Sequence, residues 1–156
     1  MKREGNIWVL GGDLRQEKLA ALLSEDGHCV HTYALDQAAP CGGIITETAL
    51  EGLHRADCVI LPLPVAAKPG VLHTPLGDGE RPLADIFSRL RPGQFLCGGM
   101  VGEETAELAG EYGLTVHDYF RREELAVANA VPTAEGAVQI ALEELEVTLH
   151  GARALV

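Results

Sequence analysis

Short apolar runs alternate along the chain with amphipathic stretches, and this alternation predicts its strands and helices. Ile7–Leu10 and Cys58–Leu61 are unbroken apolar runs, which is typical of strands buried on both faces of a parallel sheet. Less regular runs predict three further strands, at His28–Ala34, Gln94–Cys97 and Leu114–His117. We expect the two unbroken runs to be adjacent central strands, because burial on both faces accounts for their composition.

Amphipathic helices are predicted between these strands. Asp13 and Gln16 have the spacing of a capping box at the start of the first helix, and Gly27 is placed to end it. A short helix capped by Thr46 is expected after the second strand. The residues expected to form the buried stripe of the first helix are Leu19, Leu22 and Leu23.

The second half of the chain continues the pattern. Pro82 is expected at the first position of a helix, and Glu103 in the first turn of the next one. Before Pro82, the segment Pro62–Arg81 shows no apolar periodicity, and unstructured segments of this length are often functional loops. The longest helix is expected to start near Pro132, with an apolar face made of Ala134, Ala137, Val138, Ala141, Leu142 and Leu145.

Strands separated by helical crossovers predict an α/β fold. The pattern is that of a flavodoxin-like, Rossmann-type doubly wound parallel sheet of about five strands in three layers, with the order 2-1-3-4-5. The chain would end in this long helix. Ala152–Val156 resembles the start of a further strand, so we expect a boundary between a domain at residues 1–131 and a segment at 132–156 that leads into another domain.

Composition and charge narrow the classes of function. The chain has 156 residues, 12 of them Lys or Arg and 23 Asp or Glu, for a net charge of −11. This balance argues against nucleic acid or an anionic membrane as a partner, because both attract clustered basic residues. No continuous apolar run approaches the roughly 20 residues of a membrane span, and no signal peptide is recognisable. We therefore expect a cytoplasmic protein.

Several common kinds of site have no support in the sequence. The four cysteines contain no CxxC pair and the six histidines no HExxH motif, so neither a metal nor a redox centre is predicted. His28 and His31 lie three apart on a strand and would face opposite ways. The GxSxG elbow of a hydrolase is also absent.

Candidate chemistry gathers at the carboxyl edge, the edge of the sheet where the parallel strands end. Gly11-Gly12-Asp13 follows the first strand, Pro62 and Pro64 follow the third, and Gly98–Met100 follows the fourth. Ligands of open α/β sheets bind at this edge, and Arg15 could hold a ligand carboxylate in bidentate fashion. The alternative is a tight turn with Asp13 as a helix cap only and Arg15 as a solvated surface charge. The dinucleotide fingerprint GxGxxG is absent.

The most distinctive segment is Asn129–Gly136, with the sequence NAVPTAEG. Asn129 and Thr133 beside a free helix N-terminus could hydrogen-bond a polar ligand. The alternative is an ordinary capped helix start.

Together these motifs resemble a known family. Gly11–Gln16 (GGDLRQ), Leu61-Pro62, Asn129–Gly136 and then Thr148–Gly151 (TLHG) resemble the A subunit of dipicolinate synthase. The resemblance covers the N-terminal domain of that family, from about Ile7 to Val156. It implies an NADP-dependent oxidoreductase of spore-forming bacteria that forms pyridine-2,6-dicarboxylate from a lysine-pathway precursor. It also implies a location in the cytoplasm of the mother cell.

The resemblance implies a substrate-side domain at residues 1–131, followed by a hinge helix and the start of a missing C-terminal domain that binds NADP. A second, flavoprotein-like synthase subunit is the implied partner, and a homo-oligomer is compatible with it. No cofactor is expected in this chain alone, which we expect to be inactive by itself. The residues assigned to substrate binding are Gly12, Asp13, Arg15, Gln16, Pro62, Pro64, Gly99, Asn129, Thr133 and Glu135.

His150, on the returning segment, is the candidate proton donor, and its location rests on the resemblance alone. The alternative function is a non-catalytic, flavodoxin-like module for ligand binding or interaction. A flavin-binding phosphate loop is not predicted, because Gly11-Gly12-Asp13-Leu14 contains no Ser or Thr.

Overall fold

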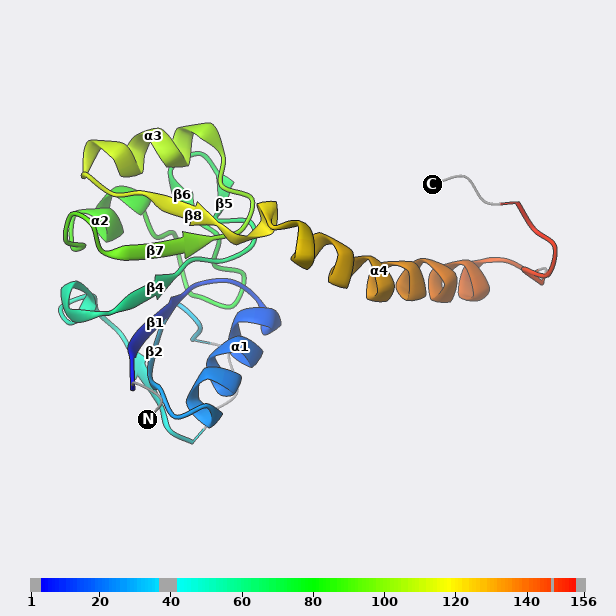
Figure 1. Cartoon of the computed structure of the whole chain (residues 1–156), viewed down its shortest axis with the longest axis horizontal. Coiled ribbons are helices and arrows are strands. Elements are labelled where there is room, and N and C mark those ends of the chain that lie inside the picture. Colours follow the sequence, from blue (N-terminus) through cyan, green and yellow to red (C-terminus); the bar gives the residue numbers. More distant parts are fainter. Residues whose placement is uncertain (1–3, 37–41, 147, 154–156) are drawn as a thin grey trace. The chain divides into compact units, whose positions relative to one another are not determined.

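Six of the described strands form one parallel sheet (Figure 1). The structure is a computed structural model, and it describes residues 4–36, 42–146 and 148–153. One compact unit comprises Met1–Phe120 and a second Arg121–Val156. The sheet of the first unit has six strands in the order β3-β2-β1-β4-β7-β8. Their bounds are β1 Asn6–Leu10, β2 Cys29–Tyr33, β3 Ile44–Glu47, β4 Cys58–Ile60, β7 Phe95–Gly98 and β8 Val116–Asp118.

The five predicted strands are present in the predicted order, and β1 and β4 are adjacent in the centre. The sheet gains one edge strand, β3, which pairs with β2 in parallel. The helix expected to start at Thr46 is therefore wrong, because Thr46 lies within β3 in register with Thr32. Ile44, Ile45 and Thr46 are β-branched and fit a pleated strand better than a helix. The resulting order, 3-2-1-4-5-6, is the one found in dinucleotide-binding doubly wound sheets.

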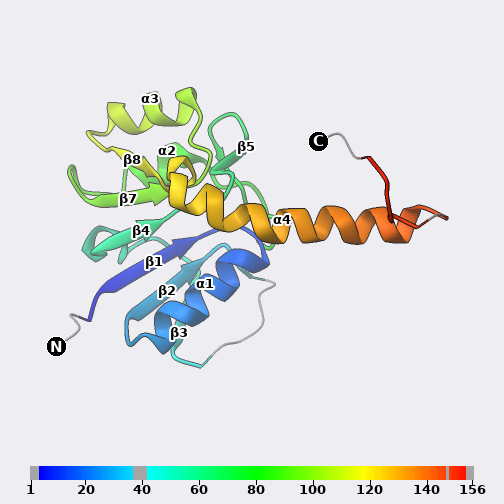
Figure 2. The ribbon, with the colours of Figure 1, turned by 45° about the vertical axis from the view of Figure 1, so that its right-hand side comes forward.

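Side chains of the central strands alternate between two cores on the two faces of the sheet. Ile7 and Val9 belong to one core, and Trp8 and Leu10 to the other. The first core packs against α1 (Leu14–Glu25), which lies along β1, β2 and β3 (Figure 2). The second contains residues of α2 (Leu83–Phe87) and α3 (Glu103–Glu111) and of the 3₁₀ turn η1 (Leu53–Arg55).

The first helix starts as expected and packs differently. The Asp13 side chain accepts a hydrogen bond from the Arg15 backbone N–H at 2.9 Å. Gln16 does not complete a capping box, because its buried side chain donates to the Leu61 carbonyl at 3.1 Å instead. Leu22 is 48% exposed and lies outside the buried stripe, whereas Ala20 is fully buried between the two expected members that pack against the core, Leu19 and Leu23.

The segment Pro62–Arg81 contains a small hairpin rather than an unstructured loop. Its antiparallel strands are β5 (Ala66–Lys68) and β6 (Val71–Leu72). The sequence shows no sign of this hairpin because its strands are only three and two residues long. Pro82 follows as the N-cap of α2 rather than its first helical residue.

The second unit contains the long helix α4 (Glu123–Glu144). It starts before the expected position, so that Pro132 and the boundary expected between residues 131 and 132 both lie inside it. Val138 and Leu142 of its apolar face are more than half exposed. α4 is long and apolar enough to cross a membrane. Helices that pack in the core of a protein can have the same length and composition. Ala152 and Arg153 are not in a strand, and the rest of the strand expected there lies outside the described residues.

Candidate functional site

Three of the predicted turns meet at the carboxyl edge of the sheet. The arrowheads of β1, β4 and β7 end on the same side in Figure 1. The Gly99 N–H donates to the Pro62 carbonyl at 3.1 Å, and the Arg15 Nη2 donates to the Leu63 carbonyl at 2.8 Å. The turns after β1, β4 and β7 are therefore in direct contact. A Cβ at Gly99 would lie within 3.0 Å of Leu63 and Tyr119 side chains, so this close packing requires glycine.

The N–H groups of the Gly11–Gly12 turn form hydrogen bonds with backbone carbonyls of the protein. Both residues have positive φ, +60° and +93°. The Gly11 N–H donates to the Tyr33 carbonyl and the Gly12 N–H to the His73 carbonyl, each at 2.8 Å. A Cβ at Gly11 would lie 2.8 Å from that His73 oxygen. The glycines thus permit the approach of the β5–β6 hairpin, and their N–H groups already have partners.

Arg15 grips a carboxylate of the protein itself. Its Nε lies 3.0 Å from Oδ1 of Asp13, and its Nη2 lies 2.8 Å from Oδ2. This bidentate hydrogen bond lowers the pKa of Asp13 below its usual value, against the smaller effect of partial burial. The Arg15 side chain remains 62% exposed. A ligand carboxylate at this position would compete with Asp13 for the guanidinium.

A tyrosine that the sequence analysis did not single out lies beside these groups. Tyr119 follows β8 directly, and its hydroxyl donates to the Leu61 carbonyl at 3.5 Å. The buried Gln16 amide donates to that same carbonyl. Burial raises the pKa of Tyr119 to about 12, and the nearby Arg15 opposes the shift. Tyr119 is thus a neutral hydrogen-bond donor at neutral pH. In the sequence, the only sign of this role is that Tyr119 comes just after a predicted strand.

The hairpin contributes a histidine to the same edge. The Nδ1 atom of His73 is buried and has no hydrogen-bond partner within the described part of the chain. His73 also lies close enough to lower the pKa of Asp13 electrostatically. It lines a cleft of about 200 Å³ formed by the hairpin. A second cleft of about 350 Å³ lies between the hairpin and the start of α3, next to Met100. The irregular composition of Pro62–Arg81 is the only sign of these clefts in the sequence.

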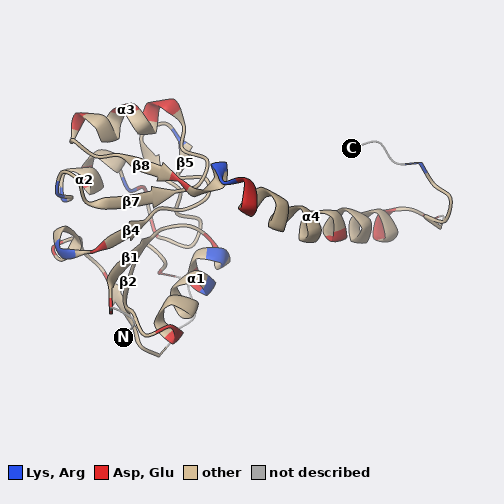
Figure 3. Cartoon of the chain, in the orientation of Figure 1, with Lys and Arg blue, Asp and Glu red and all other residues tan. Residues whose placement is uncertain are grey.

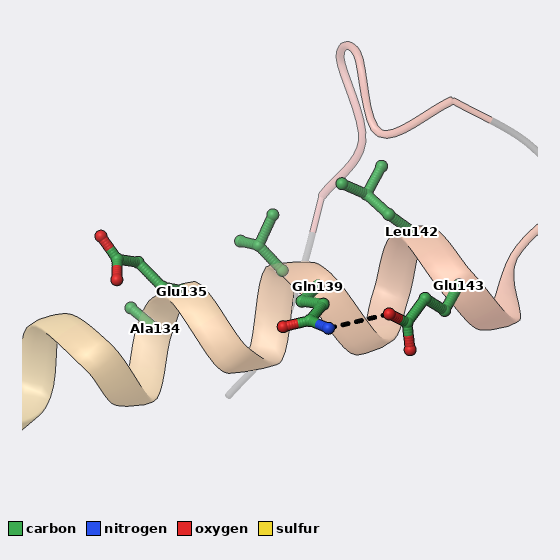
Figure 4. Close-up of a pocket in the computed structure, with 6 residues that line it drawn as sticks. Ala134, Glu135, Gln139, Leu142 and Glu143 are labelled. Carbon is green, nitrogen blue, oxygen red and sulfur yellow. Dashed lines mark hydrogen bonds between the residues drawn. The ribbon is translucent and has the colours of Figure 1, made fainter.

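The second unit holds the other assigned residues. Thr133 Oγ1 donates to the Asn129 carbonyl at 2.7 Å, and Asn129 Nδ2 lies 3.4 Å from Thr133 Oγ1. The free helix N-terminus expected at Pro132 is wrong, because α4 begins at Glu123. Glu135 borders a hollow of about 660 Å³ along one face of α4 (Figure 4). His150 lies in a turn after the helix. Their role in binding stays a prediction.

Charge is unevenly distributed over the first unit. Figure 3 shows basic residues at the start of α1 and acidic residues along α3. The first turn of α3 contains Glu103 and Glu104. Among the described residues, no three His, Cys, Asp or Glu side chains are placed to hold a metal ion. In the described part of the chain, the carboxyl edge offers hydrogen-bond donors and the exposed side chain of Arg15.

The family model for the N-terminal domain of the dipicolinate synthase A subunit matches residues 6–120. The chain belongs to this family. The match ends at Phe120, where the first compact unit also ends. The dipicolinate synthase A subunit of Bacillus subtilis (strain 168) is 26% identical over an alignment of 153 residues, which covers 96% of this chain and 52% of that protein. The chain thus spans about half the length of this curated relative.

Solved structures agree with the family assignment. The A chain of dipicolinate synthase from Bacillus subtilis has 25% sequence identity and a TM-score of 0.78, covering 97% of this chain and 52% of that one. The dipicolinate synthase A subunit from Bacillus halodurans has 21% identity and a TM-score of 0.83, covering 95% and 51%. These structures confirm the α/β architecture predicted from the sequence, and the family model confirms the predicted family.

Proposed function

We propose that this chain is the substrate-side part of an NADP-dependent oxidoreductase of the dipicolinate synthase type. The observation that carries the proposal is its membership of the family of dipicolinate synthase A subunits, matched over residues 6–120. The contact between three turns at the carboxyl edge supports it further, because open α/β sheets bind their ligands there. The product would be pyridine-2,6-dicarboxylate, formed from a lysine-pathway precursor during sporulation.

The substrate would be a planar dicarboxylate bound at this edge. Arg15 is exposed and can turn from Asp13 to a ligand carboxylate. Tyr119 and His73 would contribute further polar contacts. Affinity for the isolated chain should be low, because ligand binding here must displace the Asp13–Arg15 ion pair and lacks the contacts of the other half of the cleft. A role of Asn129 and Thr133 in substrate binding is part of the proposal and rests on the family resemblance alone.

The cofactor and partner belong to other parts of the enzyme. NADP would be held by a C-terminal domain, and a flavoprotein-like second subunit would complete the synthase in the cytoplasm. The described turn after β1 supports this division of labour, because its glycine N–H groups bond to protein carbonyls and its sequence lacks GxGxxG. We expect calorimetry with the isolated chain to show NADPH binding weaker than the micromolar range. Micromolar affinity would contradict this division.

Titration with dipicolinate, followed by amide NMR, tests the site. Shifts should cluster at Gly11–Arg15, Pro62–Pro64 and Gly98–Met100. Arg15→Ala should weaken binding about tenfold or more, because it removes a charge-assisted hydrogen bond worth about 1.5–3 kcal/mol. Asp13→Asn should strengthen binding, since it keeps a good helix cap and releases the guanidinium.

Arg55→Ala is the matched control. Arg55 is an exposed arginine just before β4, at the opposite edge of the sheet, and its loss should leave binding unchanged. Shifts confined to that opposite edge would remove the site, and so would an Arg15→Ala variant that binds as well as the parent.

A further inference from the structure

A cysteine, a histidine and a glutamate form a connected row across the neighbouring strands β2 and β3. Cys29 and His31 are alternate residues of β2, so both side chains project from the same face. Cys29 Sγ lies 3.6 Å from Nε2 of His31. His31 Nδ1 lies 2.8 Å from Oε1 of Glu47, which belongs to the edge strand β3. The thiol lies away from the carboxyl edge, because Cys29 is the first residue of β2.

The surroundings of His31 fix the orientation of its ring. The imidazole stacks on the indole of Trp8, with the centroids 5.0 Å apart and the planes within 8°. Its side chain is 15% exposed, against 31% for Glu47. An ionised carboxylate can only accept hydrogen bonds, so Nδ1 carries the ring hydrogen. In the neutral ring Nε2 then keeps a lone pair, and this lone pair faces the Cys29 thiol.

This arrangement has the parts of an activated thiol: a nucleophile, a base within reach of it, and a carboxylate that orients the base. We propose that Cys29 is a reactive thiol that low-molecular-weight disulfides convert into a mixed disulfide. The Cys29 proton passes to His31 Nε2, and the thiolate attacks one sulfur of the small disulfide. The new S–S bond forms as the old one breaks, and the departing thiolate takes up the proton. Cys29 is oxidised and half of the small disulfide is reduced to a thiol.

A metal site fits these residues less well. Only Cys29 Sγ and His31 Nε2 converge on one point, because the Glu47 carboxylate bonds to the other ring nitrogen. Stable sites for thiophilic metals use three or four protein ligands. No such group of three exists among the residues that the structure describes.

The other two described cysteines provide the internal comparison. Cys58 and Cys97 are on the neighbouring strands β4 and β7 and hydrogen-bond to each other. This bond lowers the pKa of Cys58 and, together with burial, raises that of Cys97. Each of these two thiols has the other thiol as its hydrogen-bond partner, whereas the Cys29 thiol has the His31 imidazole. Cys58 is the natural competitor of Cys29 for a disulfide reagent, so the two must be measured side by side.

The test uses the full chain with Cys41→Ser in every variant and oxidised glutathione as the probe. Peptide mass spectrometry at pH 7 follows the fraction of Cys29, Cys58 and Cys97 that carries glutathione. Cys29 should react first, with one glutathione released per modified chain. Its rate should exceed that of Cys58 by about tenfold or more, because the Cys58 thiol hydrogen-bonds to another thiol, whereas the Cys29 thiol has an imidazole base within reach.

His31→Ala should slow modification of Cys29 about tenfold and leave the rate at Cys58 unchanged. Glu47→Gln keeps the strand pairing and should slow Cys29 by a smaller factor, which covers the case in which His31→Ala disturbs the fold. His117→Ala is the matched control, because His117 lies in another strand and stacks on Phe95, with centroids 5.1 Å apart. Faster labelling of Cys58, or a Cys29 rate that neither variant lowers, would overturn the proposal.

Discussion

At the scale of single residues, the carboxyl edge is shaped by backbone that only glycine tolerates. Gly11 lets β1 end directly beneath the hairpin, where the His73 carbonyl accepts the N–H of Gly12. Gly11 and Gly12 both have positive φ, and so does Gly70 in the hairpin turn. The surroundings differ, because no atom lies within 4 Å of a Cβ built at Gly70. Alanine substitutions at Gly11 and Gly70 therefore separate the free-energy cost of a positive φ from the cost of the steric contact.

We expect Gly11→Ala to destabilise the fold by about 3 kcal/mol or more, since it combines left-handed strain with an overlap against backbone. Gly70→Ala has nearly the same φ, +65° against +60°, and should cost about 1 kcal/mol through strain alone. Urea unfolding followed by Trp8 fluorescence measures both. Equal losses of stability in the two variants would show that the hairpin moves away from a methyl group at position 11 without an energetic cost.

Asp13 gives the molecule a small dependence of stability on pH. Its pKa is lowered in the folded state by the hydrogen bond from Arg15. The stabilisation is therefore present above the unfolded pKa, near 3.8, and is lost as the pH falls through the folded value. Asp13→Asn should thus cost more at pH 6 than at pH 3, by less than about 1 kcal/mol, because solvent screens this exposed pair. Urea midpoints of both proteins at the two pH values check the sign, and a cost that grows in acid would contradict it.

The residue types at the carboxyl edge can be read from the sequence, but their partners cannot. The sequence leaves Arg15 as either a carboxylate-binding residue or a solvated surface charge, and it does not predict the short-range ion pair with Asp13. The spacing of Gln16 predicts a cap on its own helix, yet its side chain donates to Leu61, 45 residues away in the chain. His73 and Tyr119 reach the site through tertiary packing, which leaves no local pattern.

At the scale of elements, buried amides tie irregular segments to the sheet. Gln94 precedes β7 and is 8% exposed. Its Nε2 donates to the carbonyls of Leu53 and Ala56, at 3.0 and 2.7 Å, and its Oε1 accepts from the Arg91 N–H at 3.0 Å. One side chain therefore satisfies both ends of η1 and the turn before β7.

Gln94→Leu should destabilise the fold by about 1–3 kcal/mol, because it removes the side-chain donor to the buried Ala56 carbonyl. The Leu53 carbonyl keeps the Ala56 N–H as a donor. Gln139→Leu on the exposed face of α4 is the matched control and should change stability by no more than about 0.5 kcal/mol. Chemical unfolding of the two variants supplies the comparison. A near-neutral Gln94→Leu would mean that water replaces the amide at η1.

The long helix α4 contains its own weak point. Pro132 lacks an N–H, so the carbonyl four residues earlier loses its helical partner. The Thr133 hydroxyl donates to the next carbonyl, that of Asn129. Interior proline disfavours a helix by about 3 kcal/mol relative to alanine.

Pro132→Ala should therefore increase helical circular dichroism and slow amide hydrogen exchange on both sides of the position. Ala130→Gly, two residues earlier, should act in the opposite direction. Exchange rates in α4 that do not respond to either change would show that other contacts hold the helix.

Elements with strong periodicity are predictable from this sequence, and elements set by pairing are not. β1 and β4 follow from unbroken apolar runs, and α3 from its glutamates and the glycine that ends it. β3 is an edge strand of mixed polarity that becomes a strand through pairing with β2. Proline favours first helical positions, so the sequence predicts that α4 starts near Pro132, yet the nine residues before it are also helical.

At the scale of the whole molecule, opposing features govern solubility. The net charge of −11 keeps copies apart at neutral pH. The second unit exposes a series of large apolar side chains along one helix, which favours association. Those that are more than half exposed on α4 are Val127, Val131, Val138, Ile140 and Leu142.

We expect self-association to increase as the pH approaches the isoelectric point of about 4.9, where the repulsion between copies vanishes. Sedimentation velocity at constant ionic strength, between pH 8 and pH 5.5, measures it. Replacing Val138 and Leu142 by Gln should reduce the association, because both lie on the same apolar face of α4. Leu14→Gln is the control, since Leu14 is 68% exposed on the other unit and should not alter association. If Leu14→Gln reduced self-association and the substitutions in α4 did not, the surface responsible would lie on the first unit.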